Sequence, residues 1–246
     1  MSSIWSAFSL GKISLPHRLA LAPMTRLRAL PDGTPSDLAV QYYAQRASFG
    51  LLISEGTEPS AQGKGYLGSP GLYTQSHILG WKKVADAVHA HDGYLFIQLM
   101  HAGRVSHADV IPTGETPVGP SAIPTPQTIM TSAGPQAAPV PRALLTEEIP
   151  LVQEQFVTAA ANAMIAGADG VELHGANGYL LWQFLTGNAN QRTDQYGGSI
   201  ENRARFVLET VSKVVAKVGA ERVGIRLSPN MNFLGMHEDA DWKETY

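Results

Sequence analysis

The chain has no cysteine among its 246 residues. Without thiols it can form no disulfide bond, no cysteine-ligated iron–sulfur cluster and no thiol nucleophile. A chain without disulfides suits a reducing compartment, and we expect a cytoplasmic location.

Long apolar runs and blocks of one charge are also missing. No stretch approaches the roughly 18 apolar residues of a membrane helix, and residues 1–8 lack the basic and apolar regions of a signal peptide. The net charge is −3, and lysine and arginine are spread along the chain, so no basic block favours nucleic acid. The histidines show no metal-ligand spacing. We therefore expect no membrane, nucleic-acid or metal partner.

Apolar runs and amphipathic stretches alternate along the chain. The pattern predicts strands at 19–24, 51–55, 94–99, 170–174 and 223–227, and helices at 36–48, 76–90, 147–166 and 199–218. Thr146 is the expected cap of the third helix and Gly167 its stop. Continuous apolar strands between helices indicate a parallel sheet covered by helices. We expect one α/β domain over residues 1–246.

Polar residues stand at the ends of these strands, namely Thr25, Gln98, His174 and Arg226. Polar strand ends are typical of a (β/α)8 TIM barrel, whose active site lies at the carboxyl ends of its strands. A doubly wound sheet is the competing fold, but no strand leads into a Gly-x-Gly-x-x-Gly turn. A barrel needs about eight strands to close, and only about the first five βα units are present. Either another polypeptide supplies the rest, or the chain is a fragment.

Residues 100–142 interrupt the alternation with a segment rich in Pro, Gly, Ser and Thr. It is too long for a plain connection. We predict a lid or flap inserted after the third strand. A linker between two domains is less favoured, because the alternation resumes in phase afterwards.

The segment after the fourth strand places His174, Asn177 and Tyr179 within six residues. Imidazole, carboxamide and phenol can all donate hydrogen bonds while uncharged. Such a group suits a substrate oxygen that gains negative charge beside a carbon that needs a proton. It indicates a reductase rather than a hydrolase.

Several motifs together resemble the old yellow enzyme family of FMN-dependent ene-reductases, in particular the branch with pentaerythritol tetranitrate reductase and N-ethylmaleimide reductase. The matching stretches are 21–26, 41–46, 53–57, 63–66, 98–104, 174–180 and 190–199. The most specific are His174–Tyr179 and Asn190–Arg203. Family members are complete barrels of the flavin oxidoreductase type. The resemblance implies that this chain holds the first five strands and lacks the C-terminal part with the phosphate-binding loops.

The resemblance also implies a reaction. Bound FMN would accept hydride from NADPH, with NADH as the other possible reductant, and pass it to an activated C=C bond in ping-pong fashion. The expected substrates are α,β-unsaturated carbonyls, nitroalkenes, maleimides and nitro or nitrate esters.

The resemblance assigns substrate and catalytic roles to residues of this chain. His174 and Asn177 would hold the substrate oxygen, and Tyr179 would donate the proton. Tyr66 and Met100 would line the substrate pocket. The plainer alternatives are a histidine satisfied by backbone and tyrosines that only pack beneath loops.

Flavin contacts are implied for Pro23, Met24, Thr25, Gly56, Gln98 and Arg226. Arg226 stands in an apolar run and needs an anionic partner. The flavin edge is one candidate, and an ion pair with Glu55 or Glu172 is the other.

A rival hypothesis differs in class. The chain could be a non-catalytic barrel fragment that binds FMN only with a complementary C-terminal polypeptide. Two bare sheet edges would also favour a homo-oligomer.

Overall fold

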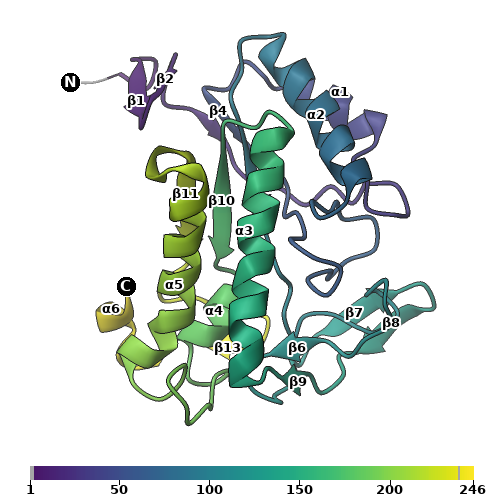
Figure 1. The fold of residues 1–246 in the computed structure, drawn as a ribbon, viewed down its shortest axis with the longest axis vertical. Coiled ribbons are helices and arrows are strands. Elements are labelled where there is room, and N and C mark those ends of the chain that lie inside the picture. Colours follow the sequence, from purple (N-terminus) through teal and green to yellow (C-terminus); the bar gives the residue numbers. More distant parts are fainter. Residues whose placement is uncertain (1–2, 238) are drawn as a thin grey trace.

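The computed structural model describes residues 3–237 and 239–246 (Figure 1). Its main sheet has five parallel strands in the order β11-β10-β5-β4-β3. They span β3 Ala20–Leu21, β4 Leu51–Ile53, β5 Leu95–Leu99, β10 Gly170–Gly175 and β11 Val223–Leu227. Spatial order follows chain order without reversal. A doubly wound sheet reverses its order at a switch point, so this sheet is built as the wall of a barrel.

Four long helices cover the outer face of the sheet: α1 Asp37–Ala44, α2 Gln75–His89, α3 Ile149–Ile165 and α5 Ile200–Val218. Figure 1 shows α3 and α5 side by side along β10. Outward-facing Ile97 and Leu173 are fully buried in the same apolar core as Trp81, Phe156 and Phe206. The predicted alternation is confirmed, although α1 ends earlier than residue 48.

The predicted cap at Thr146 is wrong. Residues Thr146–Glu148 form a 3-10 turn, and α3 begins only at Ile149. The Thr146 hydroxyl instead donates to the Asp194 carboxylate at 2.5 Å. Thr146 lies inside the 3-10 turn, whose N-cap is Leu145, and its hydroxyl contacts Asp194 and Arg192 instead of a helix N–H group.

A hairpin that the sequence did not reveal closes the amino-terminal end of the sheet. It consists of β1 Phe8–Leu10 and β2 Ile13–Leu15, paired antiparallel. Leu15 packs against Leu51 and Phe96 on the inner face of the sheet. A Cβ on Gly170 would lie only 2.4 Å from the Phe96 ring. Phe96 therefore occupies the space that a side chain at Gly170 would need.

The interrupting segment 100–142 forms a small separate layer at the other end of the sheet. Within it, β7 Thr128–Thr131 and β8 Gly134–Ala137 make an antiparallel hairpin, and β6 Val118–Gly119 pairs with β9 Arg142–Ala143. Figure 1 shows the hairpin projecting at the lower right, at the end toward which β10 points. Its action as a lid stays a prediction.

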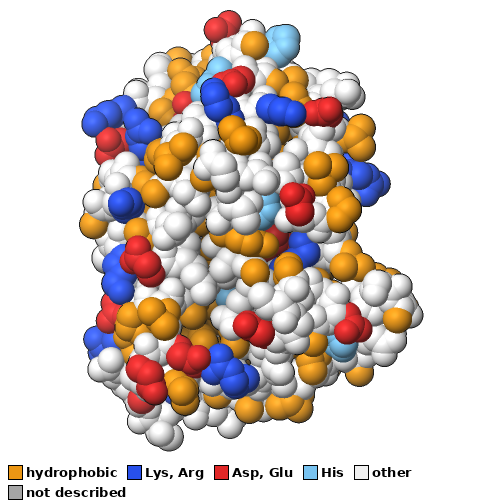
Figure 2. All heavy atoms as spheres, turned by 45° about the vertical axis from the view of Figure 1, so that its right-hand side comes forward, with side chains coloured by type: hydrophobic (Ala, Val, Ile, Leu, Met, Phe, Trp, Pro, Cys, Tyr) orange, Lys and Arg blue, Asp and Glu red, His pale blue; other side chains and the backbone are white. Residues whose placement is uncertain are grey.

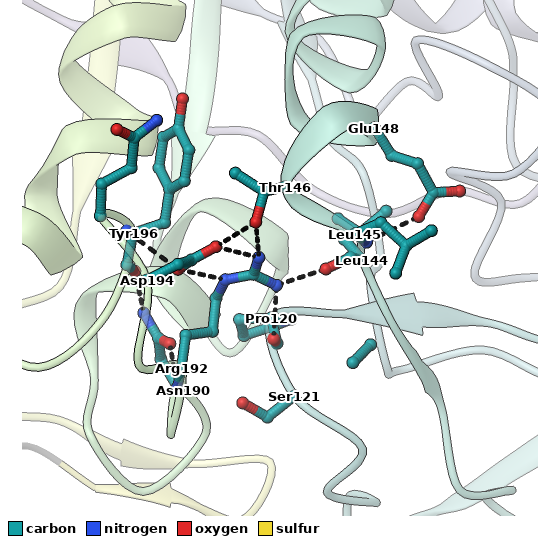
Figure 3. Close-up of polar contacts among 12 residues, drawn as sticks. Pro120, Ser121, Leu144, Leu145, Thr146, Glu148, Asn190, Arg192, Asp194 and Tyr196 are labelled. Carbon is teal, nitrogen blue, oxygen red and sulfur yellow. Dashed lines mark hydrogen bonds and ion pairs between the residues drawn. The ribbon is translucent and has the colours of Figure 1, made fainter.

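Arg192 fastens the base of this segment to the loop before α5 (Figure 3). Its guanidinium donates to Asp194 at 2.9 and 2.5 Å, to the Pro120 carbonyl at 3.1 Å and to the Leu144 carbonyl. Thr146 Oγ1 accepts a further bond at 3.3 Å. The Arg192 side chain is 9% exposed, so nearly all its donors are used inside the protein.

Shorter elements complete the described chain: α4 Leu180–Leu185, a 3-10 turn at Ala220–Arg222, β12 Asn232–Phe233, β13 Met236–His237 and α6 Trp242–Thr245. Across the described residues, every helix is too short or too polar to cross a membrane.

Candidate active site

Four polar side chains lie on the inner face of the sheet, opposite the helices. Parallel pairing places Gln98 beside Glu172 and His174 beside Arg226. Glu172 and His174 are two residues apart on β10, so both point to the same face. The four residues therefore share one surface, near the carboxyl ends of β5, β10 and β11.

Glu172 and Gln98 are joined directly. The Gln98 carboxamide nitrogen donates to the Glu172 carboxylate at 2.7 Å. Burial raises the pKa of Glu172, while the Gln98 hydrogen bond and the charge of Arg226 oppose that rise. Sequence reasoning gave Glu172 no role in a site. Its spacing of two from His174 was the signal that could have found it.

Arg226 is half-buried on this face. Its guanidinium forms no ion pair within 4 Å with Glu55 or Glu172, so that alternative is wrong. Glu55 instead accepts the backbone N–H groups of Arg26 and Leu27 at 2.7 and 3.0 Å. Among the described residues, Arg226 thus keeps its guanidinium donors available on the inner face.

His174 is 4% exposed. Burial, and then the charge of Arg226, lowers its pKa to about 3, so the imidazole is neutral near pH 7. Its Nδ1 has no hydrogen-bond partner among the described residues. A buried polar atom without a partner is rare in folded proteins, and it suits a ring that binds a ligand.

Two tyrosines meet beside His174. The Tyr66 and Tyr179 hydroxyls are 2.8 Å apart, and the rings of His174 and Tyr179 are 5.0 Å apart. Burial, followed by the proximity of Tyr66, raises the pKa of Tyr179. Its phenol therefore carries its proton at neutral pH. The pairing joins residues 113 positions apart, which no local sequence pattern reveals.

Asn177 lies in the turn that follows β10. Its φ angle is 54°, a left-handed conformation that asparagine tolerates better than most residues. Its backbone N–H donates to the Ser228 hydroxyl at 3.1 Å. This bond ties the turn to the loop that follows β11, the strand that carries Arg226.

Met100 and Gly56 pack against each other. A Cβ on Gly56 would lie 2.6 Å from the Met100 sulfur, so only glycine fits there without displacing the thioether. Met100 is 4% exposed and belongs to one apolar cluster with Tyr179 and partly buried Tyr66. The structure thus brings the predicted pocket residues together.

Pro23, Met24 and Thr25 follow β3 at the edge of the sheet. Met24 is 43% exposed, and Thr25 is also exposed. They stand at the same end of the sheet as Gln98 and Arg226. Figure 2 shows the molecule hollowed between its main body and a projecting lower lobe.

The comparisons with known proteins agree with this geometry. The family model described as "NADH:flavin oxidoreductase / NADH oxidase family" matches residues 3–245. The chain belongs to this family. The predicted resemblance and the partial TIM barrel are thereby confirmed, since the fold is also that of solved family structures.

Two family structures superpose closely. Morphinone reductase aligns with a TM-score of 0.94 and 46% identity, covering 98% of this chain and 66% of that one. An old yellow enzyme homologue from Zymomonas mobilis aligns with a TM-score of 0.96 and 38% identity, covering 99% and 68%.

Curated family relatives show the same partial coverage. The 12-oxophytodienoate reductase 1 of Oryza sativa subsp. japonica is 47% identical over 228 residues, which is 92% of this chain and 59% of that protein. Flavin oxidoreductase hxnT of Emericella nidulans is 47% identical over 234 residues, or 93% and 60%. The chain therefore spans about three fifths of the length of these relatives.

Proposed function

We propose that this chain carries the active-site half of an FMN-dependent NAD(P)H oxidoreductase that reduces activated C=C bonds. The expected substrates are α,β-unsaturated carbonyls, nitroalkenes, maleimides, and nitro or nitrate esters. The observation that carries the proposal is the shared inner face of Gln98, His174 and Arg226, with the Tyr66–Tyr179 pair beside it.

The donor set fits FMN. Arg226 offers a guanidinium without a carboxylate partner in Glu55 or Glu172, which suits the edge of an isoalloxazine that becomes anionic on reduction. Gln98 can donate and accept along the same edge. The remaining contacts would come from backbone or short side chains at strand ends, at Pro23, Met24, Thr25 and Gly56.

When bound, FMN would supply hydride chemistry, taking hydride from NAD(P)H and delivering it to the substrate alkene. His174 and Asn177 would donate hydrogen bonds to the carbonyl or nitro oxygen, on which negative charge grows. Each well-placed donor contributes about 3 kcal/mol to such a transition state. Because the imidazole is neutral, it can donate without a buried counter-charge.

Tyr179 would hold the proton that the second alkene carbon receives. Its raised pKa means that the phenol gives up this proton only to a strongly basic, carbanion-like carbon. Tyr66 and Met100 form the wall of the substrate pocket. Both substrates would use this one pocket in turn, so ping-pong kinetics are expected.

Flavin binding is the first test. The purified chain is mixed with FMN, and the yellow absorption band is followed anaerobically as NADPH is added. Retention of FMN, followed by bleaching, is the expected result. A chain that stays colourless, yet gains FMN when the C-terminal part of a relative is co-expressed, would favour the barrel-fragment hypothesis.

Tyr179→Phe tests the chemistry. Its re-oxidation by an enone should slow about 100-fold, while its reduction by NADPH is unchanged. Tyr94→Phe is the matched control, because Tyr94 lies at the other end of β5 and packs against the cluster of Leu15, Leu51 and Phe96. Equal re-oxidation rates in both variants would remove Tyr179 from the mechanism.

A further inference from the structure

A buried carboxyl group lies beneath the loop that carries Tyr66. Glu58 is 0% exposed, and its backbone bonds to Pro70 and Leu72 at 2.9 Å each. These bonds join the two ends of the loop from Gly56 to Thr74. The Glu58 side chain lies inside this loop, against Ser69 and Lys64, and the proposed reaction gives it no role.

The Ser69 hydroxyl contacts two oxygen atoms, and the number of protons available to these contacts depends on the protonation state of Glu58. The Ser69 Oγ lies within hydrogen-bonding distance of the Glu58 Oε1 and 2.6 Å from the Tyr66 carbonyl oxygen. A hydroxyl has only one proton to donate, and a carbonyl can only accept. If Glu58 is protonated and donates to Ser69, which in turn donates to Tyr66, each contact has its own proton, whereas an ionised Glu58 would compete with the Tyr66 carbonyl for the single Ser69 proton.

We propose that protonated Glu58 is a positioning residue, which acts through Ser69 to hold Tyr66 against Tyr179, and that its ionisation loosens this hold. The Tyr66 backbone is fixed by the Ser69 hydroxyl, and the Tyr66 phenol lies 2.8 Å from that of Tyr179. The proton on Glu58 is thus linked, through one hydroxyl and one tyrosine, to the proton donor of the proposed reaction.

The charged and titratable groups that face Glu58 are Lys64, Glu55 and Tyr73. The Lys64 Nζ lies 3.9 Å from the Glu58 Oε2 and donates to the Ser69 carbonyl at 3.2 Å. The Glu58 Oε2 has no hydrogen bond among the described residues. Burial raises the pKa of Glu58 to about 7, against the opposing effects of Lys64 and Ser69.

Ionisation would reverse the direction of these bonds. A Glu58 carboxylate can only accept, so the Ser69 hydroxyl would turn to it and leave the Tyr66 carbonyl. That carbonyl would keep only the longer bond from the Ser69 N–H, at 3.4 Å. The carboxylate would also attract Lys64, which is 5% exposed. Near neutral pH the loop therefore has two hydrogen-bonded states.

The test follows the Glu58 carboxyl and the Tyr66 ring separately. The chain is labelled with carbon-13 at glutamate carboxyl and tyrosine ring carbons, and NMR spectra are recorded from about pH 5 to pH 9. Glu58→Gln assigns the Glu58 signal. We expect the Glu58 carboxyl and the Tyr66 ring to titrate with one midpoint near neutrality.

Two variants test whether the Tyr66 signal responds to Glu58 through Ser69 or only to a general change of structure. Glutamine can donate to Ser69 at every pH, so in Glu58→Gln the Tyr66 signal should stay in its low-pH position. In Ser69→Ala the Glu58 carboxyl should still titrate, but Tyr66 should no longer follow it. Glu154→Gln, at an exposed helix position, is the control and should behave as the unmodified chain.

Unfolding gives an independent measurement. A carboxyl whose pKa is raised on folding stabilises the fold below its unfolded pKa, and this stabilisation is lost as the pH rises through about 7. Glu58→Gln should abolish that part of the decline. Each unit of pKa shift corresponds to about a tenfold change in the unfolding constant.

A Glu58 carboxyl that is ionised throughout this pH range would overturn the proposal. So would a Tyr66 signal that ignores the Glu58 titration. Neither measurement needs flavin or substrate, so such a failure would leave the proposed function standing. The link to catalysis rests on the proposed function. In a chain that binds FMN, this link predicts that the rate of flavin re-oxidation falls at alkaline pH and that Glu58→Gln abolishes the fall.

Discussion

Two arginines near the carboxyl ends of the strands have opposite surroundings. The Arg192 guanidinium donates hydrogen bonds to Asp194, to two carbonyl groups and to Thr146. Arg226, on the inner face of the sheet, has no ion pair with either of the carboxylates expected to meet it. A guanidinium satisfied by the protein anchors structure, whereas one left with free donors is suited to a ligand. The surroundings of the two arginines, not the residue type, therefore separate a structural anchor from a position suited to binding.

Arg192→Ala should have the largest effect on stability. It would leave the Asp194 carboxylate, whose pKa Arg192 holds below its usual range, without its charged partner, and two carbonyls without their donor. Breaking such a pair costs about 3 kcal/mol of unfolding free energy, measurable by urea denaturation. Lys82→Ala, in an exposed helix pair, is the control. Equal losses in the two variants would show that Arg192 is no anchor.

Arg226→Ala should change ligand binding rather than stability. A charged hydrogen bond contributes about 2 kcal/mol, so FMN should bind about 30-fold more weakly. Unfolding without FMN should be unchanged. Arg222→Ala, at the opposite end of β11 and exposed, is the matched control. If Arg226→Ala instead unfolds the flavin-free chain, the contrast with Arg192 is lost.

Glu172→Gln should alter the pH dependence of stability. Burial raises the pKa of Glu172, so its stabilising contribution is present at acid pH and is lost as the pH rises through the folded pKa. Glutamine removes that loss and can still accept from Gln98. The stability of the variant relative to the unmodified chain should rise with pH in urea titrations. A constant difference would mean that Glu172 is ionised throughout.

Arg142→Ala should have the smallest effect. Arg142 pairs with Glu148 at 2.6 Å, but its side chain is 44% exposed. Exposed pairs contribute about 0.5 kcal/mol. The change is measured by thermal or urea unfolding. A loss of unfolding free energy as large as that of Arg192→Ala would mean that exposure does not explain the difference between Arg142 and Arg192.

The sheet and its helices could be predicted because their signals are local. Strand β11 and helix α5 match the expected ranges to within a residue, since an apolar run and the Ser199 cap mark them. The shared face of Glu172 and His174 also follows from simple alternation. Helix α4 was missed because all six of its residues are buried, which leaves no polar side to mark a helical period.

Long-range contacts could not be predicted. Whether Arg226 would meet Glu55 depended on which partner Glu55 had already taken, and the sequence does not show that Glu55 accepts from Arg26 and Leu27. The Thr146 hydroxyl was likewise expected on a helix end and lies on Asp194. These choices depend on competition between distant groups in three dimensions.

The contact of Phe96 with Gly170 shapes the inner face of the sheet below its polar residues. The ring fills the volume of one missing carbon, 2.4 Å away, and it stands one layer below Gln98 on the same strand face. Adding that carbon would force the ring to move. The inner face can thus be reshaped through position 170 without changing any of the four polar residues on it.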